Sequence, residues 1–168
     1  MGAWNVISLI EDDHLSLLSS ELKHLNIGIA ALSDVRRPDS GEIMVGGYTY
    51  YWSGHSDSYH AQGVAVAVSN KLTPMINEVT PGNKRITRLR IRHSFGVISL
   101  VSVSALTEAS DLTLKDTFYA TLESVVVSAP DEIHFSSWGI SMHRLELIGM
   151  VIMLRIWKPC VHRQPESP

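Results

Sequence analysis

A carboxylate and a run of arginines are the side chains whose placement in this sequence could serve chemistry. Asp34 follows the apolar residues 27–32, which read as a strand, and side chains at the carboxyl ends of strands commonly form functional sites. Arg88, Arg90 and Arg92 alternate with apolar residues, so they share one face of a strand. That face is either a solvated one on an edge strand or one that contacts phosphate groups. Both interpretations stay open.

Other candidates for a metal ligand or a nucleophile lack a supporting pattern. His55 and His60 share a polar loop, but two histidines need a third ligand to hold a metal ion, so a solvated loop is the simpler interpretation. The motif G-x-S-x-G marks the nucleophilic serine of one class of hydrolases, and Ser104 does not lie in such a motif. Three more histidines occur without a strand or helix period: His134, His143 and His162. We therefore expect neither a zinc site nor a serine hydrolase.

Composition places the chain among ordinary globular proteins. Its 168 residues fit one domain, 45% are hydrophobic and 18% charged, and the formal net charge is -3. This mild acidity gives no general support to nucleic-acid binding, which normally needs a surplus of Lys and Arg. Cys160 is the only cysteine, which excludes an internal disulfide and indicates a reducing, intracellular compartment, nuclear or cytoplasmic. Charged residues interrupt each apolar tract, so we expect neither a signal peptide nor a membrane span.

The apolar pattern predicts the strands and helices that would position these side chains. Strands are expected at residues 4–10, 27–32, 48–53, 63–69, 86–93 and 96–104, and helices at 15–25 and 111–126. Residues 36–41 read as a loop, and the short turns between the later strands predict an antiparallel sheet. No period continues after Val126, so residues 127–168 are expected to form a poorly ordered tail outside the domain of residues 1–126.

Four motifs, in order, carry a resemblance to a known family. They are GAWNV at residues 2–6, LSDVRR at 32–37, GGYTYYWSG at 46–54 and GVAVAV at 63–68. Together they resemble the endonuclease domain of RTE-type non-LTR retrotransposons and of the related craniofacial development protein-like group, within the endonuclease/exonuclease/phosphatase family. The resemblance covers residues 2–126. It implies an incomplete two-layered α/β sandwich and a Mg²⁺-dependent phosphodiesterase that acts on nucleic acid.

The resemblance assigns roles to three residues. Asn5 matches the first asparagine of the family site, which helps to position the metal ion and the phosphate. Asp34 stands where the family has a metal-binding glutamate, and its shorter side chain is expected to weaken binding of Mg²⁺, which demands near-octahedral geometry. Ser104 lies in VSALT, where the family reads VYAPT with a tyrosine that stabilises the transition state. Losing such a donor typically costs about 10²–10³ in rate, so slow or absent catalysis is expected.

Two further family motifs, GDFN and SDH, do not occur in the sequence. Residues 127–151 nevertheless accept a set of codons that, read one base earlier, encode QCPRRDTLLVLGDFNASTGTDRDG, which contains GDFN. We infer a one-base change of reading frame near Val126. This change accounts for the lost periodicity and for the Met-, Trp- and His-rich composition of the tail.

Three functions follow from these features. The chain is a retroelement-derived, Mg²⁺-dependent endonuclease-like fragment without catalysis, an active DNA endonuclease whose C-terminal part is altered in this sequence, or a non-catalytic module that binds nucleic acid or protein through Arg88, Arg90 and Arg92. The missing motifs favour the first, because losing part of a group of residues that act together is nearly as harmful as losing all of them. Low stability is also expected, since the missing strands would leave apolar faces of residues 64–103 open.

Overall fold

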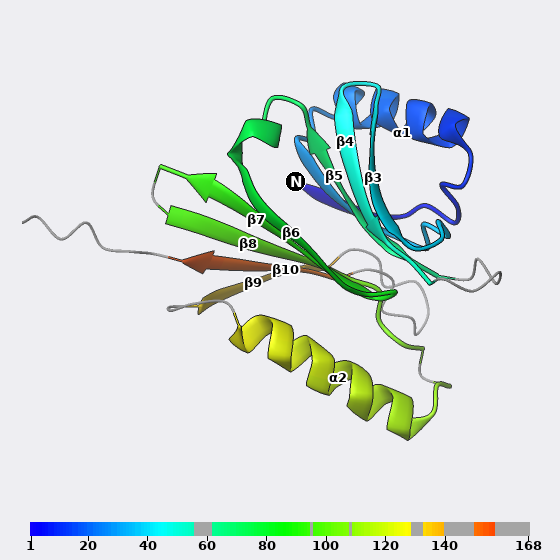
Figure 1. Ribbon diagram of the computed structural model, residues 1–168, viewed down its shortest axis with the longest axis vertical. Helices are drawn as coiled ribbons and strands as arrows, with labels where there is room; N and C mark the ends of the chain where they lie inside the picture. The colour runs from blue at the N-terminus through cyan, green and yellow to red at the C-terminus, as the bar shows by residue number, and fades with distance from the viewer. Residues whose placement is uncertain (56–61, 95, 108, 129–132, 140–149, 157–168) are drawn as a thin grey trace, which may run out of the picture.

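The computed structural model describes residues 1–55, 62–94, 96–107, 109–128, 133–139 and 150–156. Within them two five-stranded sheets, A and B, lie face to face, and each carries one helix on its outer side (Figure 1). The layers run from helix α1 (Asp12–His24) through sheet A and sheet B to helix α2 (Leu112–Val127). The expected mixed α/β content is confirmed in these residues.

Sheet A combines one parallel strand pair with antiparallel strands. Its order is β1 (Gly2–Asn5), β2 (Ile29–Ser33), β5 (Val64–Ser69), β4 (Tyr48–Ser53) and β3 (Ser40–Val45). β1 and β2 are parallel, α1 is the crossover that connects them, and the other neighbours are antiparallel. The register places Asn5 beside Ser33, so the segments that follow β1 and β2 leave the sheet at the same edge.

Sheet B is antiparallel throughout. Its order is β6 (Ile76–Asn83), β7 (Ile86–His93), β8 (Gly96–Val103), β10 (Met150–Ile156) and β9 (Ile133–Gly139), and a 3-10 turn, η1 (Thr73–Met75), precedes β6. Along β7, the buried residues Leu89 and Ile91 alternate with Arg88 and Arg90. The two faces of this strand therefore differ in chemistry, with the apolar side toward sheet A and the arginines toward α2.

The ends of both helices carry residues that favour helix formation. α1 begins with the acidic residues Asp12 and Asp13 and has the positively charged Lys23 in its last turn, an arrangement that interacts favourably with the helix dipole. The side chain of Asp111 caps α2 by accepting a hydrogen bond of 2.7 Å from the amide of Thr113. In the part of the chain that the structure describes, no helix has the length and apolar character needed to cross a membrane.

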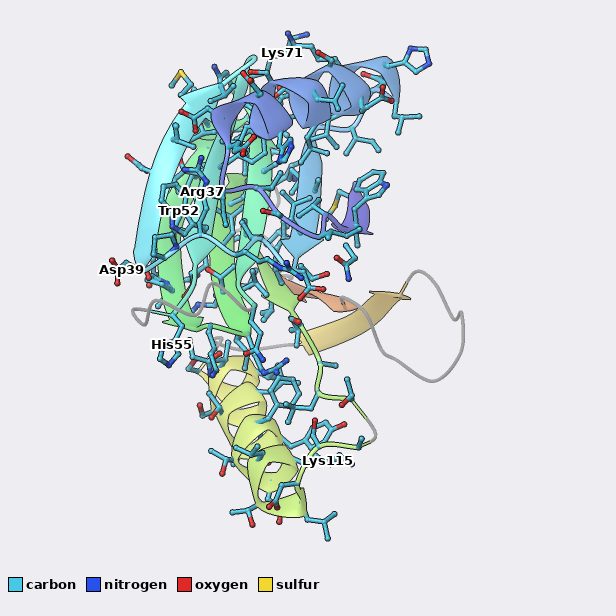
Figure 2. The ribbon with its side chains drawn as sticks, turned by 90° about the vertical axis from the view of Figure 1, so that its right-hand side faces the viewer. Arg37, Asp39, Trp52, His55, Lys71 and Lys115 are labelled. Atoms are coloured by element: carbon cyan, nitrogen blue, oxygen red, sulfur yellow. The ribbon has the colours of Figure 1, made fainter. Side chains whose placement is uncertain are left out.

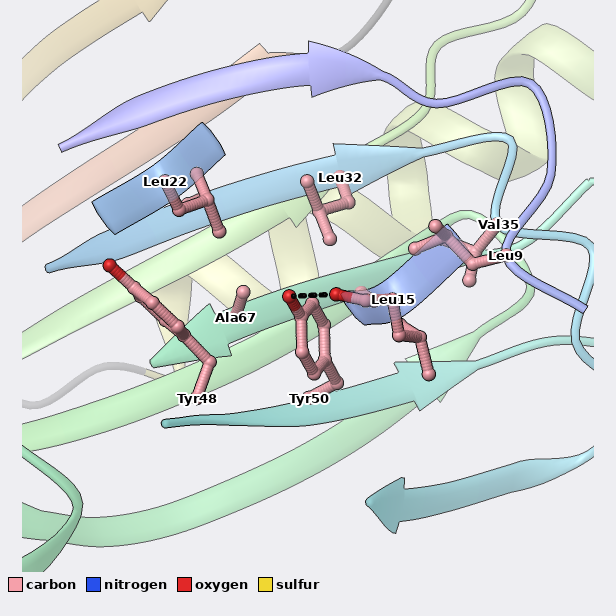
Figure 3. Close-up of a cluster of buried hydrophobic side chains, with 10 residues drawn as sticks. Leu9, Leu15, Leu22, Leu32, Val35, Tyr48, Tyr50 and Ala67 are labelled. Atoms are coloured by element: carbon pink, nitrogen blue, oxygen red, sulfur yellow. Dashed lines mark hydrogen bonds between the residues drawn. The ribbon is translucent and has the colours of Figure 1, made fainter. Parts of the chain in front are cut away.

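The cluster between α1 and sheet A surrounds a buried tyrosine. Leu15 and Leu22 of α1 pack there against sheet A, and Leu15 lies beside Tyr50 (Figure 3). The Tyr50 hydroxyl lies 2.7 Å from Oγ of Ser19 and 3.3 Å from the carbonyl oxygen of Leu15. Burial raises the pKa of Tyr50, so the hydroxyl stays neutral and links α1 to β4.

Two further clusters complete the layers. The first lies between the sheets and contains Val66, Val68, Leu89, Ile91 and Leu100. The second lies between sheet B and α2 and contains Ile86, Val101, Val103, Phe118 and Leu122. Each sheet face that is covered by a neighbouring layer therefore presents aliphatic side chains, which is what burial of apolar area requires.

Within residues 1–126 the sequence pattern did not predict two strands, and both lie at sheet edges. β3 overlaps the segment 36–41 that reads as a loop, and its residues are alternately exposed and half-buried. β6 contains Pro81 and Gly82 and pairs with β7 in an irregular register. Edge strands tolerate proline because they need fewer ladder hydrogen bonds, so composition does not reveal them. β1 is also shorter than the expected 4–10, since Ile7 has a left-handed backbone with φ 63°.

The segment 127–168 contains regular structure that periodicity did not predict. α2 includes Val127, and the backbones of β9 and β10 extend sheet B beyond β8. The other residues after Ser128 lie outside the described ones. The division of the chain at residue 126 therefore stays a prediction.

A Leu89→Ala variant tests the packing of one sheet against the other. We expect the free energy of unfolding to fall by about 2–5 kcal/mol, because the change removes fully buried carbons between the sheets and leaves a cavity. Urea unfolding followed by circular dichroism measures this loss. Met44→Ala is the control, since Met44 is exposed on β3 and should change the value by less than about 0.5 kcal/mol. Equal losses in the two variants would contradict the described core.

Candidate functional site

Asn5 and Asp34 meet where β1 and β2 end. Asn5 is the last residue of β1, and Asp34 directly follows β2. The side-chain nitrogen Nδ2 of Asn5 donates a hydrogen bond of 2.6 Å to Oδ2 of Asp34, 29 residues away in the sequence. The structure thus brings together the two residues that were predicted to bind a metal ion. We call them the Asn5–Asp34 pair.

Backbone geometry fixes the direction of both side chains. Oδ1 of Asn5 accepts a hydrogen bond of 3.0 Å from the amide of Ile7, which turns the chain immediately after β1. Asp34 has a left-handed backbone with φ 57°, a conformation that aspartate and asparagine tolerate better than most residues. The amide of Val35 then donates to the carbonyl oxygen of Gly63 at 3.1 Å. The turns at the two strand ends therefore position the pair, although Asn5 is exposed and Asp34 only half-buried.

Arg85 adds a positive charge near this carboxylate. It precedes β7, and its Nη1 donates to the carbonyl oxygens of Ser104 at 3.2 Å and Ala105 at 3.1 Å. Burial lowers the pKa of the Arg85 guanidinium, and the negative charge of Asp34 opposes that shift. Arg85 lies outside the alternating run 88–92, so the sequence pattern did not indicate a role for it. Its position directly before a strand was the signal that could have singled it out.

Ser104 lies beside Arg85 but is buried. Its amide donates to the carbonyl oxygen of Arg85 at 2.9 Å, which continues the pairing of β7 with β8. Only 8% of the residue is exposed, so its hydroxyl has little access to a substrate in solvent. Ser104 therefore holds the Arg85 segment in place and is poorly placed to contact a phosphate directly.

The chemistry of the Asn5–Asp34 pair fits a Mg²⁺ ion that relies on a single protein carboxylate. Mg²⁺ usually keeps several waters and binds one or two carboxylates together with substrate phosphates. Asp34 supplies the carboxylate, and Asn5 holds it in position through one of its oxygens. Within the described ranges, no group of three or more His, Cys, Asp or Glu side chains could share a metal ion. The pair thus resembles half of a site that water and phosphate would complete.

β7 is an interior strand of sheet B, so the interpretation of Arg88, Arg90 and Arg92 as an edge-strand face is wrong. Oε2 of Glu78 lies 3.1 Å from Nη1 of Arg90, and Oε1 lies 3.4 Å from Nη2 of Arg88. Arg92 donates to Oδ1 of Asn77 at 3.0 Å. These arginines lie on the side of sheet B that faces α2 and are not part of the site at the end of sheet A. Their contact with phosphate stays a prediction.

Among the residues that the structure describes, no histidine that was considered for metal binding is part of the Asn5–Asp34 site. His55 follows β4 and is exposed. His60, His143 and His162 lie outside the described residues, and so does the side chain of His134.

Arg37 ties together the two loops that carry the Asn5–Asp34 pair. From the segment after β2, its Nε donates to the carbonyl oxygen of Leu9 at 2.6 Å, and its Nη2 lies 2.6 Å from Oδ1 of Asp12. The guanidinium also lies over the ring of Trp52, 4.9 Å from its centroid. Both residues are labelled, close together, in Figure 2. Leu9 lies between β1 and α1, and Asp12 is the first residue of α1, so one side chain links the segments that follow β1 and β2 to β4.

A comparison of the sequence with models of protein families gives no match, and neither does a comparison with curated proteins. The function proposed below therefore rests on the contacts at the ends of β1 and β2 and on the motifs in residues 2–126.

An Arg37→Lys variant tests this link between the loops. Lysine keeps the charge near Asp12 but loses the Nε donation to Leu9 and the planar contact with Trp52, so we expect unfolding free energy to fall by about 1–2 kcal/mol. Urea unfolding measures the change. Arg36→Lys is the matched control, since Arg36 is the adjacent arginine and is exposed. A loss of the same size in the control would show that Arg37 has no special role.

A Glu78→Gln variant tests the ion pairs on β7 through their pH dependence. Hydrogen bonds from Thr80 and Arg90, and the charges of Arg88 and Arg90, lower the pKa of Glu78 below its ordinary value of 4.5. A carboxyl group with a lowered folded-state pKa adds stability above the unfolded pKa and loses it as pH falls through the folded one. The stability difference between wild type and variant should therefore be constant above about pH 6 and shrink below about pH 4.5.

The size of this difference should stay under about 1 kcal/mol, because the Glu78 side chain is 40% exposed and solvent screens the pairs. Urea midpoints measured from acid to neutral pH give the value. A difference that grows as the pH falls would have the wrong sign for the described contacts.

Proposed function

We propose that this chain is an endonuclease-like domain of the endonuclease/exonuclease/phosphatase type, related to retroelement endonucleases, that binds Mg²⁺ and phosphate weakly and does not cleave phosphodiesters efficiently. The observation that carries the proposal is the 2.6 Å contact between Asn5 and Asp34. The motif resemblance, which uses the sequence alone, assigns the same two residues to one metal site. Agreement between a spatial contact and a motif-based assignment supports the proposal.

The residues around the pair have complementary roles in it. A Mg²⁺ ion at such a site lowers the pKa of a bound water and neutralises charge on a phosphate. Asp34 supplies a negatively charged oxygen, and Asn5 orients it by donating a hydrogen bond. Arg85 contributes positive charge on the side of sheet B, close enough for Asp34 to influence its pKa. A phosphate next to Asp34 would therefore also be attracted by a nearby guanidinium.

Efficient hydrolysis needs more than this half-site. The attacking water must lose a proton to a placed base, and donors must meet the charge that develops on the phosphate. Ser104 replaces the tyrosine that the family resemblance leads one to expect, and it is buried. The GDFN and SDH motifs, which would supply further groups, are absent from the sequence. We therefore propose that the chain retains metal binding but has lost efficient cleavage of phosphodiesters.

Two assays on the whole chain test the two halves of the proposal. Binding of Mn²⁺, followed by the electron paramagnetic resonance signal of the free ion, should be measurable in the wild type and weaken at least about 10-fold in Asp34→Ala. Nicking of supercoiled plasmid in Mg²⁺ should be no faster with wild type than with Asp34→Ala. Asp39→Ala is the matched control, because Asp39 is an exposed aspartate with a similar left-handed φ of 53°.

Each contrary result has a distinct meaning. Equal Mn²⁺ binding by wild type and Asp34→Ala would remove the metal site from the proposal. Nicking by wild type that disappears in Asp34→Ala but persists in Asp39→Ala would establish an active endonuclease instead.

A further inference from the structure

A second polar cluster lies on the side of sheet B that faces α2. It consists of Glu78 on β6, Arg88 and Arg90 on β7, and Ser99 on β8, and we call it the β7 cluster. The antiparallel register places Glu78 and Ser99 on either side of Arg90, so these side chains project from the same face. The cluster shares no residue with the Asn5–Asp34 pair.

Glu78 occupies only the terminal nitrogens of the two arginines. Its carboxylate pairs with Nη1 of Arg90 and Nη2 of Arg88, and Nη1 of Arg88 donates to Oγ of Ser128 at 2.9 Å. Three other polar atoms are buried and have no hydrogen-bond partner among the described residues: Nε of Arg88, Nε of Arg90 and Oγ of Ser99. Each of these groups can donate a hydrogen bond.

What this cluster lacks is an acceptor. A buried donor without a partner costs about 1–3 kcal/mol, and more when it belongs to a charged group, so three such donors on one face call for an explanation. Two guanidinium groups face one carboxylate, which leaves a net positive charge. An anion with several acceptor oxygens would satisfy the donors and balance the charge together, and guanidinium groups match phosphate oxygens especially well.

We propose that the β7 cluster binds a phosphate group, either free or at the end of a chain. The depth of the donors favours a terminal phosphate over one inside a nucleic-acid backbone. The side chains of Arg88 and Arg90 are only 14% and 21% exposed, and Ser99 is fully buried. Because these side chains are buried to this extent, a phosphate flanked by sugars on both sides is too bulky to reach Ser99.

Two features limit the affinity. Glu78 repels an anion, and the C-terminal end of α2, next to Ser128, is the negative end of the helix dipole. These effects offset part of the attraction of the arginines, so binding should be weak, on the order of millimolar.

Isothermal titration calorimetry of the whole chain with inorganic phosphate tests this site. Chloride keeps the ionic strength constant. Arg90→Gln should weaken binding about 10-fold or more, and Ser99→Ala about 5- to 10-fold, because each removes a donor to a charged ligand. Ser99→Ala should leave the unfolding midpoint unchanged or raised, since the hydroxyl it removes has no partner. This variant keeps the test informative even if Arg90→Gln fails to fold.

Two matched controls separate the site from general charge effects. Lys71→Gln removes one positive charge at an exposed residue after β5, and Ser102→Ala removes a buried hydroxyl from the opposite face of β8. Both should bind phosphate within about twofold of wild type. Absence of phosphate binding in the wild type, or equal losses in variants and controls, would overturn the proposal.

A competition experiment tests the choice of a terminal phosphate. A short oligonucleotide without terminal phosphates should compete poorly with inorganic phosphate, whereas the same oligonucleotide with a 5′-phosphate should compete. Equal competition by the two oligonucleotides would show that the cluster contacts backbone phosphates and would contradict this part of the proposal. These results are independent of Mn²⁺ binding at Asp34.

Discussion

Two parallel strands cannot be joined by a tight turn, and β1 and β2 of this chain are parallel neighbours. The connection must return along the sheet, and α1 makes that return while burying Leu15 and Leu22 against it. As a result the carboxyl ends of β1 and β2 lie side by side. Asn5 and Asp34 are in contact for this reason, and the hydrogen bonds of Arg37 hold the two segments that follow in a fixed relation.

Sheet B is covered on both faces, by sheet A on one side and by α2 on the other. The face toward sheet A is aliphatic, as two packed sheets require. The face toward α2 is aliphatic near Ile86, Phe118 and Leu122 and polar near Arg88 and Arg90. Glu78 pairs with these partly buried arginines, and any buried donor that Glu78 does not reach is costly.

The sequence predicted those elements whose apolar pattern reflects their own burial. The buried strands β4, β5, β7 and β8 and both helices follow from alternation or helical spacing, and Asp34 was found because it directly follows an apolar run. Within residues 1–126, β3 and β6 were not found, since edge strands are half-exposed and tolerate Pro81 and Gly82. β9 and β10 were not found because residues 127–168 were read as a tail without periodicity. Arg85 and Arg37 were also not assigned roles, because their partners are carbonyl oxygens and a ring that only tertiary folding brings near.

The backbone at Asp34 links the length of the acidic side chain to the shape of its loop. Its φ of 57° suits a short polar residue, whereas a glutamate there would reach one methylene farther but would favour a negative φ. Such a change of backbone would pull on the hydrogen bond between the Val35 amide and the Gly63 carbonyl. The length of the acidic side chain and the backbone conformation of its loop are therefore coupled. A single Asp34→Glu substitution would need a second substitution in the loop before the longer side chain could bind a metal ion better.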